Sequence, residues 1–153
     1  MADPRATATS HGTCIAIDGA GVLIRGSPGA GKSDLALRLI DDGAKLVADD
    51  QVRLHIRDGA LIAQPPDELR GMMEVNGIGI MRVDPANLAD EAALALVVDL
   101  VAGGEVERLP EAEAESVMGI ELPRIRLSPF EASAPAKLRL AAGRGTGFIM
   151  PPP

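Results

Sequence analysis

The feature that most constrains this chain is a glycine-rich segment placed between a short apolar run and a helical pattern. The segment matches G-x-x-x-x-G-K-[ST] at every position, in the order Gly26, Ser27, Pro28, Gly29, Ala30, Gly31, Lys32, Ser33. Val22–Arg25 precedes it as a predicted strand, and Ser33–Asp42 follows with apolar residues at helical spacing. Glycines let backbone N–H groups converge on oxygens, and a helix N-terminus attracts anions. This context therefore predicts a loop that binds nucleotide phosphates rather than an ordinary turn.

The same pattern predicts which side chains contact the phosphates. Lys32 is placed to reach the β and γ phosphates of a nucleoside triphosphate such as ATP, and the Ser33 hydroxyl is placed to ligate Mg²⁺. Phosphoryl transfer also needs an acid that holds the metal and a group that orients or deprotonates the nucleophile. The acidic residues downstream of the loop are the candidates for both roles.

Three acidic sites follow the loop. Asp49 and Asp50 end a short predicted strand, and repulsion between adjacent carboxylates suits one of them to proton transfer, although a solvated strand end has the same pattern. Asp99 follows the apolar run Leu94–Val98, an arrangement typical of nucleotide hydrolases. Glu74 is the third candidate. From the residues alone these assignments stay open.

Composition and charge argue against several other classes. The net charge of −7 and an aromatic content of 1% disfavour a nucleic-acid-binding surface, which needs Lys/Arg clusters and stacking side chains. Cys14 is the single cysteine, so an internal disulfide is excluded and a buried apolar role is expected. The apolar segment Ala92–Ala102 is too short to cross a membrane, and Met1–Ser10 does not resemble a signal peptide. The expected location is the cytoplasm.

Periodicity and turn residues predict an α/β fold with a mixed sheet in one domain. We expect that domain at residues 11–142, with flexible tails at 1–10 and 143–153. The expected strands and hairpins are 13–17 with 22–25, 45–48, 52–57 with 60–63, 94–101, a possible edge at 105–108, and an edge strand through Pro123 at 120–127. Segment 74–80 is expected as a glycine-broken strand or loop, and 137–142 as a short strand or helix.

Four blocks in this order resemble the catalytic domain of the HPr kinase/phosphorylase family. The blocks are His11-Gly12, Gly26–Ser33, Leu46–Asp50 and Met73–Ile80, and the resemblance extends over residues 11–127. Members of that family use ATP to phosphorylate a serine of HPr, a small phosphocarrier protein of the sugar phosphotransferase system, and bifunctional members also remove the phosphate. The resemblance implies a P-loop fold related to phosphoenolpyruvate carboxykinase, and a homo-oligomer, commonly a hexamer.

The resemblance also implies roles for individual residues. Asp49 matches the position of the proton acceptor for the target serine, with Asp50 completing the pair, and family position is the only ground for choosing Asp49 over Asp50. Glu74 matches the second acid that binds Mg²⁺, beside Ser33. His11 matches a histidine near the reacting phosphates. Under this alignment Asp99 is a structural strand residue.

The chain departs from the family pattern in ways that favour a kinase-only short form. The family's N-terminal domain is expected to be absent, and the C-terminal helices that dock the protein substrate are expected to be truncated. Asn76 stands where the family carries an arginine, and Ser128–Pro135 stands where it carries an Arg- and Gly-rich segment used in dephosphorylation. The arginines that remain as candidates for stabilising the transition state are Arg70, Arg82, Arg124 and Arg126.

Two other functions are compatible with the same loop. A P-loop kinase or NTPase acting on a small molecule would use Asp99 rather than Glu74 as its metal-binding acid. A nucleotide-sensing module without catalysis would bind ATP and transfer no phosphate.

Overall fold

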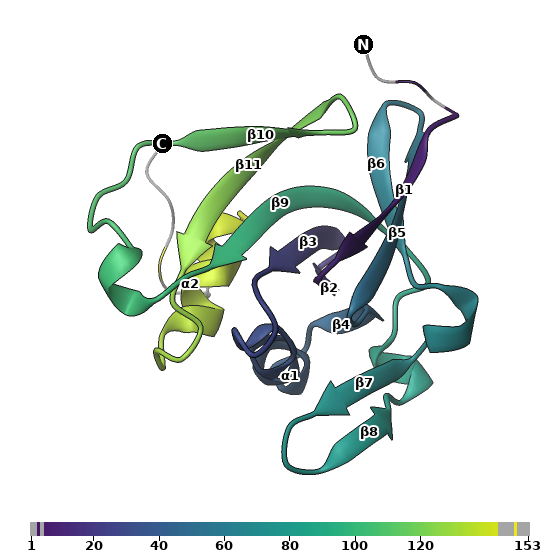
Figure 1. The fold of residues 1–153 in the computed structure, drawn as a ribbon, viewed down its shortest axis with the longest axis horizontal. Helices are drawn as coiled ribbons and strands as arrows, with labels where there is room; N and C mark the ends of the chain where they lie inside the picture. Colours follow the sequence, from purple (N-terminus) through teal and green to yellow (C-terminus); the bar gives the residue numbers. More distant parts are fainter. Residues whose placement is uncertain (1–2, 4, 144–148, 150–153) are drawn as a thin grey trace.

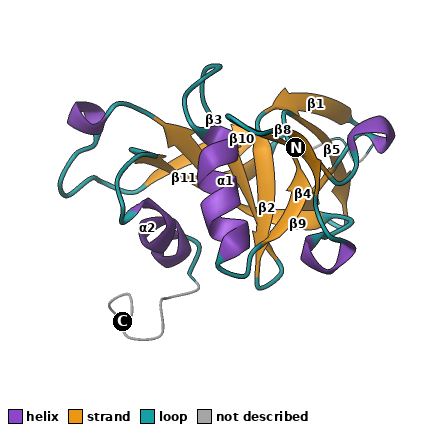
Figure 2. Cartoon of the chain, turned by 90° about the horizontal axis from the view of Figure 1, so that it is seen from below, coloured by secondary structure: helices purple, strands orange, loops and turns teal. Residues whose placement is uncertain are grey.

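The fold is a strongly curled mixed sheet with two helices on one face (Figures 1 and 2). The structure is a computed structural model that describes residue 3, residues 5–143 and residue 149. Its strands are β1 Thr7–His11, β2 Thr13–Ile17, β3 Ala20–Arg25, β4 Lys45–Ala48, β5 Gln51–Arg57, β6 Ala60–Gln64, β7 Met72–Val75, β8 Gly79–Arg82, β9 Ala92–Leu100, β10 Glu113–Val117 and β11 Ile120–Leu127. Its helices are α1 Lys32–Asp41 and α2 Ala134–Ala141, with 3₁₀ turns η1 Asp67–Leu69, η2 Pro85–Asn87 and η3 Gly103–Glu105.

Strand β9 organises the sheet. The main path runs β1-β5-β6-β9-β3-β2-β4, β11 also pairs with β9, and β10 pairs with β11. The β3–β9 and β9–β11 pairs are parallel, and the other pairs of this sheet are antiparallel, so the predicted mixed character is confirmed. The register aligns Arg25 with Asp99 and Asp99 with Arg126. The carboxyl ends of β3, β9 and β11 therefore lie together, immediately beneath the glycine-rich loop.

Alternation along the central strands builds a core on each face of the sheet. Ile15, Ile24 and Val98 face α1 and α2, where Leu35, Leu39 and Leu138 are fully buried. Cys14, Leu23 and Val97 face the other way and are covered by the curled strands β4, β5 and β6. Figure 2 shows α1 and α2 side by side against the strands. Burial raises the pKa of the Cys14 thiol to about 12, so this cysteine is a packed apolar group.

Most predicted elements are present, and three predictions are wrong. β1 includes residues 7–10, which we assigned to a flexible tail, because that segment pairs with β5 in register Thr7↔His55. The expected edge at 105–108 is not a strand, and β10, which was not predicted, occupies the edge instead. β11 lies between β9 and β10 rather than at an edge, with Pro123 opposite Ala114. In the tail expected at 143–153, residues 144–148 and 150–153 lie outside the described residues.

No helix in the described ranges has the length and apolar character needed to span a membrane.

Gly21 lies where the backbones of β3 and β9 approach each other closely. A β-carbon built on Gly21 would lie 2.8 Å from the Ala93 carbonyl oxygen and 3.1 Å from the Ala92 Cβ. Because backbone cannot easily move away, we expect Gly21→Ala to lower the free energy of unfolding in urea by roughly 1–3 kcal/mol. Gly104→Ala is the control, since nothing lies within 4 Å of its built β-carbon. Equal effects of the two substitutions would contradict the close approach.

Candidate functional site

The glycine-rich loop between β3 and α1 leaves the first amides of α1 without partners among the residues that the structure describes. Gly29 and Gly31 have φ values of 80° and 102°, a left-handed backbone that favours glycine, and Gly31 is the N-cap of α1. No side chain caps the helix, while the Gly31 carbonyl already accepts from Leu35 N at 2.9 Å. Free amides at a helix N-terminus together with its partial positive charge form an anion site. The loop therefore has the free amides that an anion site requires, and phosphate binding there stays a prediction.

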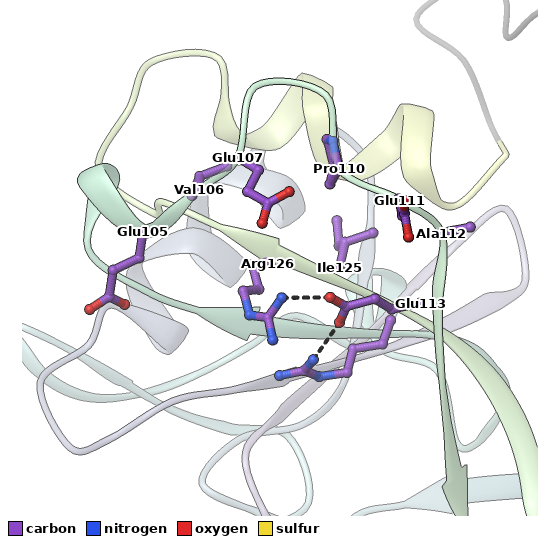
Figure 3. Close-up of a pocket in the computed structure, with 10 residues that line it drawn as sticks. Glu105, Val106, Glu107, Pro110, Glu111, Ala112, Glu113, Ile125 and Arg126 are labelled. Carbon is purple, nitrogen blue, oxygen red and sulfur yellow. Dashed lines mark hydrogen bonds and ion pairs between the residues drawn. The ribbon is translucent and has the colours of Figure 1, made fainter.

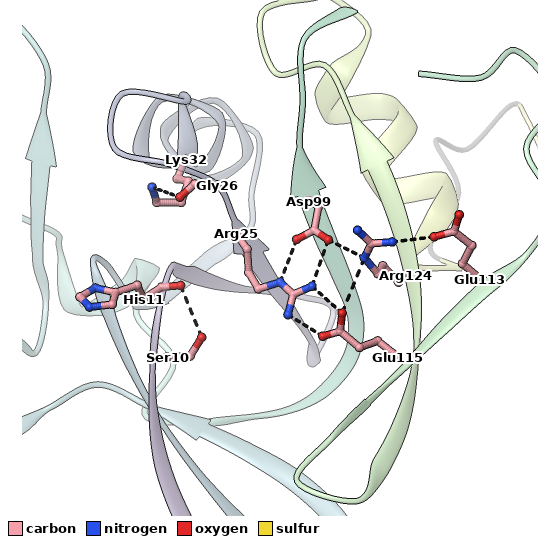
Figure 4. Close-up of polar contacts among 9 residues, drawn as sticks. All are labelled: Ser10, His11, Arg25, Gly26, Lys32, Asp99, Glu113, Glu115 and Arg124. Atoms are coloured by element: carbon pink, nitrogen blue, oxygen red, sulfur yellow. Dashed lines mark hydrogen bonds and ion pairs between the residues drawn. The ribbon is translucent and has the colours of Figure 1, made fainter. Parts of the chain in front are cut away.

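Lys32 is folded back over this loop. Its Nζ donates to the carbonyl oxygens of Gly26 at 2.8 Å and Ser27 at 3.1 Å, and the first of these contacts is drawn in Figure 4. An ammonium has three donors, so one remains for a phosphate oxygen while the other two brace the loop.

Asp49 joins three elements at the mouth of the loop. One carboxylate oxygen, Oδ1, accepts from the Thr13 hydroxyl at 2.9 Å and the Ser33 hydroxyl at 2.8 Å, and Oδ2 accepts from Glu74 N at 3.0 Å. Asp49 is only 7% exposed, and Thr13 is fully buried. A buried carboxylate requires such donors, because water is not available to replace them. Asp49 thus ties β2, α1 and β7 into one site.

Asp50 differs from its neighbour although the two are adjacent. Its side chain is exposed and lines the same cavity as Lys32 and Ser33, a space of about 400 Å³. Its backbone is left-handed, with φ of 70°, and its carbonyl accepts from Gly12 N at 3.1 Å. Aspartate tolerates this conformation better than most residues, and such strain is frequent at functional sites.

The cavity gathers residues that the sequence predicted and others that it did not. Besides the loop, Asp49, Asp50 and Glu74 all line it. His11 ends β1 one residue before Gly12, but its side chain is not among the lining residues. The lining residues that sequence reasoning missed are Thr13, Asp34, Asn76 and Phe130. Thr13 had one usable signal, a hydroxyl in an otherwise apolar strand directly after His11-Gly12.

The charge of the cavity calls for a cation. Its lining holds four carboxylates, those of Asp34, Asp49, Asp50 and Glu74, against the single ammonium of Lys32. A triphosphate would be repelled by this surplus unless a metal ion accompanied it. The Ser33 hydroxyl donates its hydrogen bond to Asp49, so the lone pairs of its oxygen remain available to a metal ion. No group of three or more His, Cys, Asp or Glu side chains in the described part of the chain could hold a metal ion by itself. The residues present therefore fit a Mg²⁺ that keeps most of its ligands from water and phosphate and takes one or two from the protein.

Asp99 is bound to two arginines and is not among the residues that line the cavity beside the loop. Arg25 donates to it through Nε at 2.8 Å and through a terminal nitrogen at 3.0 Å, and Arg124 donates through Nε at 2.5 Å (Figure 4). Arg25 also binds Glu115 at 2.5 and 2.9 Å. Burial pushes the pKa of Asp99 upward, but the arginine hydrogen bonds outweigh it and leave that pKa below its ordinary value. The geometry disfavours Asp99 as a metal ligand.

A second cavity, of about 270 Å³, lies between β11 and the segment 105–113. Figure 3 shows Glu113 accepting from Arg126 at 2.7 Å, and Arg124 donates to the same carboxylate at 2.6 Å. The other acids on its lining are Glu105, Glu107 and Glu111. With its arginines paired and its remaining charges negative, this cavity does not suit a phosphate group.

Comparison with known proteins supplies an independent result. The family model described as HPr serine kinase C-terminal domain matches residues 5–138. Two similar curated proteins are HPr kinase/phosphorylases. That of Peptoclostridium acidaminophilum is 40% identical over 74% of this chain, and that of Streptococcus thermophilus is 35% identical over 76%. The chain covers 36% and 41% of their respective lengths. The Hpr(Ser) kinase/phosphatase structure from Coxiella burnetii matches with a TM-score of 0.77 and 30% identity, covering 86% of this chain and 91% of that one.

The Asp99 cluster predicts an acid-sensitive contribution to stability. Because the folded pKa of Asp99 is lowered, its contribution is complete above the ordinary carboxyl pKa of about 3.9 and is lost as the pH falls through the folded pKa. We expect Asp99→Asn to lower the free energy of unfolding at pH 7 by roughly 1–2 kcal/mol, a difference that shrinks toward pH 3. Urea unfolding across this pH range measures it.

Glu91→Gln is the matched control, because it removes a more exposed carboxylate that pairs with Arg57. A loss at Asp99 no larger than at Glu91, or one independent of pH, would contradict the proposed coupling.

Proposed function

Because this chain belongs to the HPr serine kinase C-terminal domain family, we propose that it transfers the terminal phosphoryl group of ATP to a serine of an HPr-type phosphocarrier protein. The observation that carries the proposal is the site formed by Asp49, Asp50 and Glu74 beside the uncapped N-terminus of α1. It combines an anion site with two candidate metal ligands, Ser33 and Glu74, and an accessible carboxylate, which are the parts that phosphoryl transfer requires. The family resemblance further supports a P-loop fold of the phosphoenolpyruvate carboxykinase type, a homo-oligomer and a cytoplasmic location.

Mg²⁺ would be held by Ser33 and Glu74. When bound, it neutralises charge on the triphosphate and on the transferring group. Asp49 accepts hydrogen bonds from the Ser33 hydroxyl and from the backbone N–H of Glu74, so one carboxylate would position both of these ligands. The role of Asp49 is thus that of a positioning residue.

We assign the proton acceptor to Asp50 rather than to Asp49, whose position in the family pattern first favoured it. Two carboxylate oxygens offer about four acceptor sites, and three of those of Asp49 are taken by Thr13, Ser33 and Glu74. Asp50 is exposed in the same cavity. As the serine oxygen attacks the terminal phosphorus and the bond to the leaving oxygen of ADP breaks, the serine proton passes to the Asp50 carboxylate.

The arginines also bear on the reaction. Arg124 and Arg126 are bound to Glu113, and Arg70 is bound to Asp90. Arg82 is opposite Met72 on the β7–β8 hairpin, two residues along from the pair Glu74↔Ile80, so it lies on the same face of the hairpin as Glu74. Arg82 is the candidate best placed to approach the transferring group. The replacement of the family's arginine-rich segment by Ser128–Pro135 supports a kinase without phosphorylase activity.

Variants at the two aspartates test the assignment. With Mg-ATP and an HPr-type phosphocarrier, intact mass should show one added phosphate on a serine. Asp50→Asn should lower the transfer rate roughly 10²- to 10⁴-fold while ATP affinity is retained, because only the proton acceptor is lost. Asp49→Asn should lower both the transfer rate and the affinity for ATP, because it disturbs the positions of Ser33 and Glu74.

Lys32→Ala is the control that removes the ammonium contact to the phosphates and leaves the loop amides in place. If Asp50→Asn transferred phosphate at the parent rate and Asp49→Asn alone were inactive with normal ATP affinity, Asp49 would be the acceptor. ATP binding with no transfer to the carrier would favour a small-molecule kinase or a nucleotide-sensing module.

Metal dependence follows from the charge of the cavity. We expect removal of Mg²⁺ by a chelator to weaken ATP binding roughly ten- to a hundredfold, because the four carboxylates then face the phosphates without a cation. Glu74→Gln should weaken the Mg²⁺ dependence, whereas Asp99→Asn should leave it unchanged. Titration calorimetry at several Mg²⁺ concentrations measures both, and the reverse ranking would favour Asp99 as the metal-binding acid.

A further inference from the structure

Phe130 is an exposed aromatic side chain at the edge of the phosphate-binding cavity. The chain has only two phenylalanines and no tryptophan or tyrosine, so few of its side chains could stack on a planar ligand. It is 70% exposed, yet it lines the cavity with Lys32 and Ser33. A β-carbon built on Gly31 would lie 2.9 Å from Phe130 Cζ and 3.1 Å from Cε1, so the edge of the ring rests against the N-cap of α1. Packing in the core does not account for it.

The turn that carries this ring is fastened to α1. Arg38, one turn along the helix from Asp34, donates to the carbonyl oxygen of Pro129 and, at 3.4 Å, to that of Glu131. Its Nε also binds Asp34 at 3.2 Å. Behind the turn, Lys137 of α2 binds the Glu131 carboxylate at 2.6 Å. Both carbonyls that flank Phe130 are therefore held by one guanidinium, and the ring is presented in a fixed place.

Phe130 and Asp49 approach α1 from different sides of the helix axis. Gly31, Asp34 and Arg38 share a stripe at i, i+3 and i+7, and Phe130 contacts this stripe. Ser33, which binds Asp49, is about 140° around the helix from Arg38, at about 100° per residue. The free amides of the helix N-terminus lie between the two sides. A ligand whose reacting end faces the acids would therefore direct its other end toward Phe130.

We propose that Phe130 is a platform on which the base of the bound nucleotide stacks. The inference rests on the proposed function and deepens it, since it assigns the base end of the nucleoside triphosphate whose phosphates the loop binds. Any base can stack on an aromatic side chain, because every base has a π-face. A ring that is already held in place loses little conformational entropy when the nucleotide binds. The sequence segment that lacks the family's arginines thus contributes to nucleotide affinity instead.

The test compares a ligand that has a base with one that does not. We expect Phe130→Ala to weaken Mg-ATP binding about tenfold in titration calorimetry and to leave the affinity for inorganic tripolyphosphate unchanged. Phe130→Leu keeps an apolar side chain without a π-face and should resemble Phe130→Ala. Because the ring is mostly exposed, both variants should unfold at the parent urea concentration.

A tryptophan reporter gives a second measurement, since the chain has no tryptophan of its own. In Phe130→Trp, ATP should quench the emission of the introduced side chain, whereas tripolyphosphate should not. Leu109→Trp is the control, because Leu109 is 85% exposed and does not line the cavity.

The outcomes separate the inference from the function on which it rests. Equal losses for ATP and tripolyphosphate in Phe130→Ala, or no loss for either, would overturn the platform while leaving the phosphate site intact. A raised KM for the carrier protein with unchanged ATP affinity would also overturn it, and would make Phe130 a docking residue for the protein substrate. Failure of the parent chain to bind either ligand would overturn the proposed function itself.

Discussion

The carboxylate of Asp49 is the contact on which the candidate site depends. It is nearly buried, and its three donors come from β2, from the first turn of α1 and from β7. An unpaired carboxylate in this place would cost several kcal/mol, so the three elements can close around it only together. The same bonds set the Ser33 oxygen and the backbone of Glu74. One buried carboxylate therefore fixes the relative positions of α1 and of the hairpin that carries Glu74.

This arrangement requires the two-sided sheet beneath it. β3 and β9 are parallel and contribute to the core on both faces, so the loop after β3 starts from a buried strand of the central sheet. α1 is held on this sheet by Leu35 and Leu39, both fully buried, while its N-terminus stays open to the cavity. The β7–β8 hairpin belongs to a separate two-stranded sheet and is joined to the site through Asp49 and through contacts with α1.

Local patterns sufficed for the elements around the loop, because alternation in β2 and β3 and helical spacing in α1 act over a few residues. Local patterns failed where the pairing of segments distant in sequence determines the secondary structure. β10 is largely exposed and has no apolar pattern, and it becomes a strand only because β11 pairs with it. Likewise Phe130 and Arg38 lie 92 positions apart, and nothing local to either residue indicates that the Pro129–Glu131 turn binds α1. The motif located the site, whereas the partners of Asp49 and Asp99 came only from the fold.

Arg25 and Arg38, one at each end of the loop, both contact the segment formed by β11 and the turn after it, directly or through Asp99. At the entrance to the loop, Arg25 shares Asp99 with Arg124 of β11. At its exit, Arg38 of α1 holds the turn that follows β11. The loop is thus braced at both ends by one segment that is distant in sequence. Asp99, at the end of β9, has the sequence position of a metal ligand. It instead links β3 to β11, because the guanidinium groups of Arg25 and Arg124 both bind it. Changes in the segment after β11 are therefore expected to act on the loop, even though the residues of the loop motif stay the same.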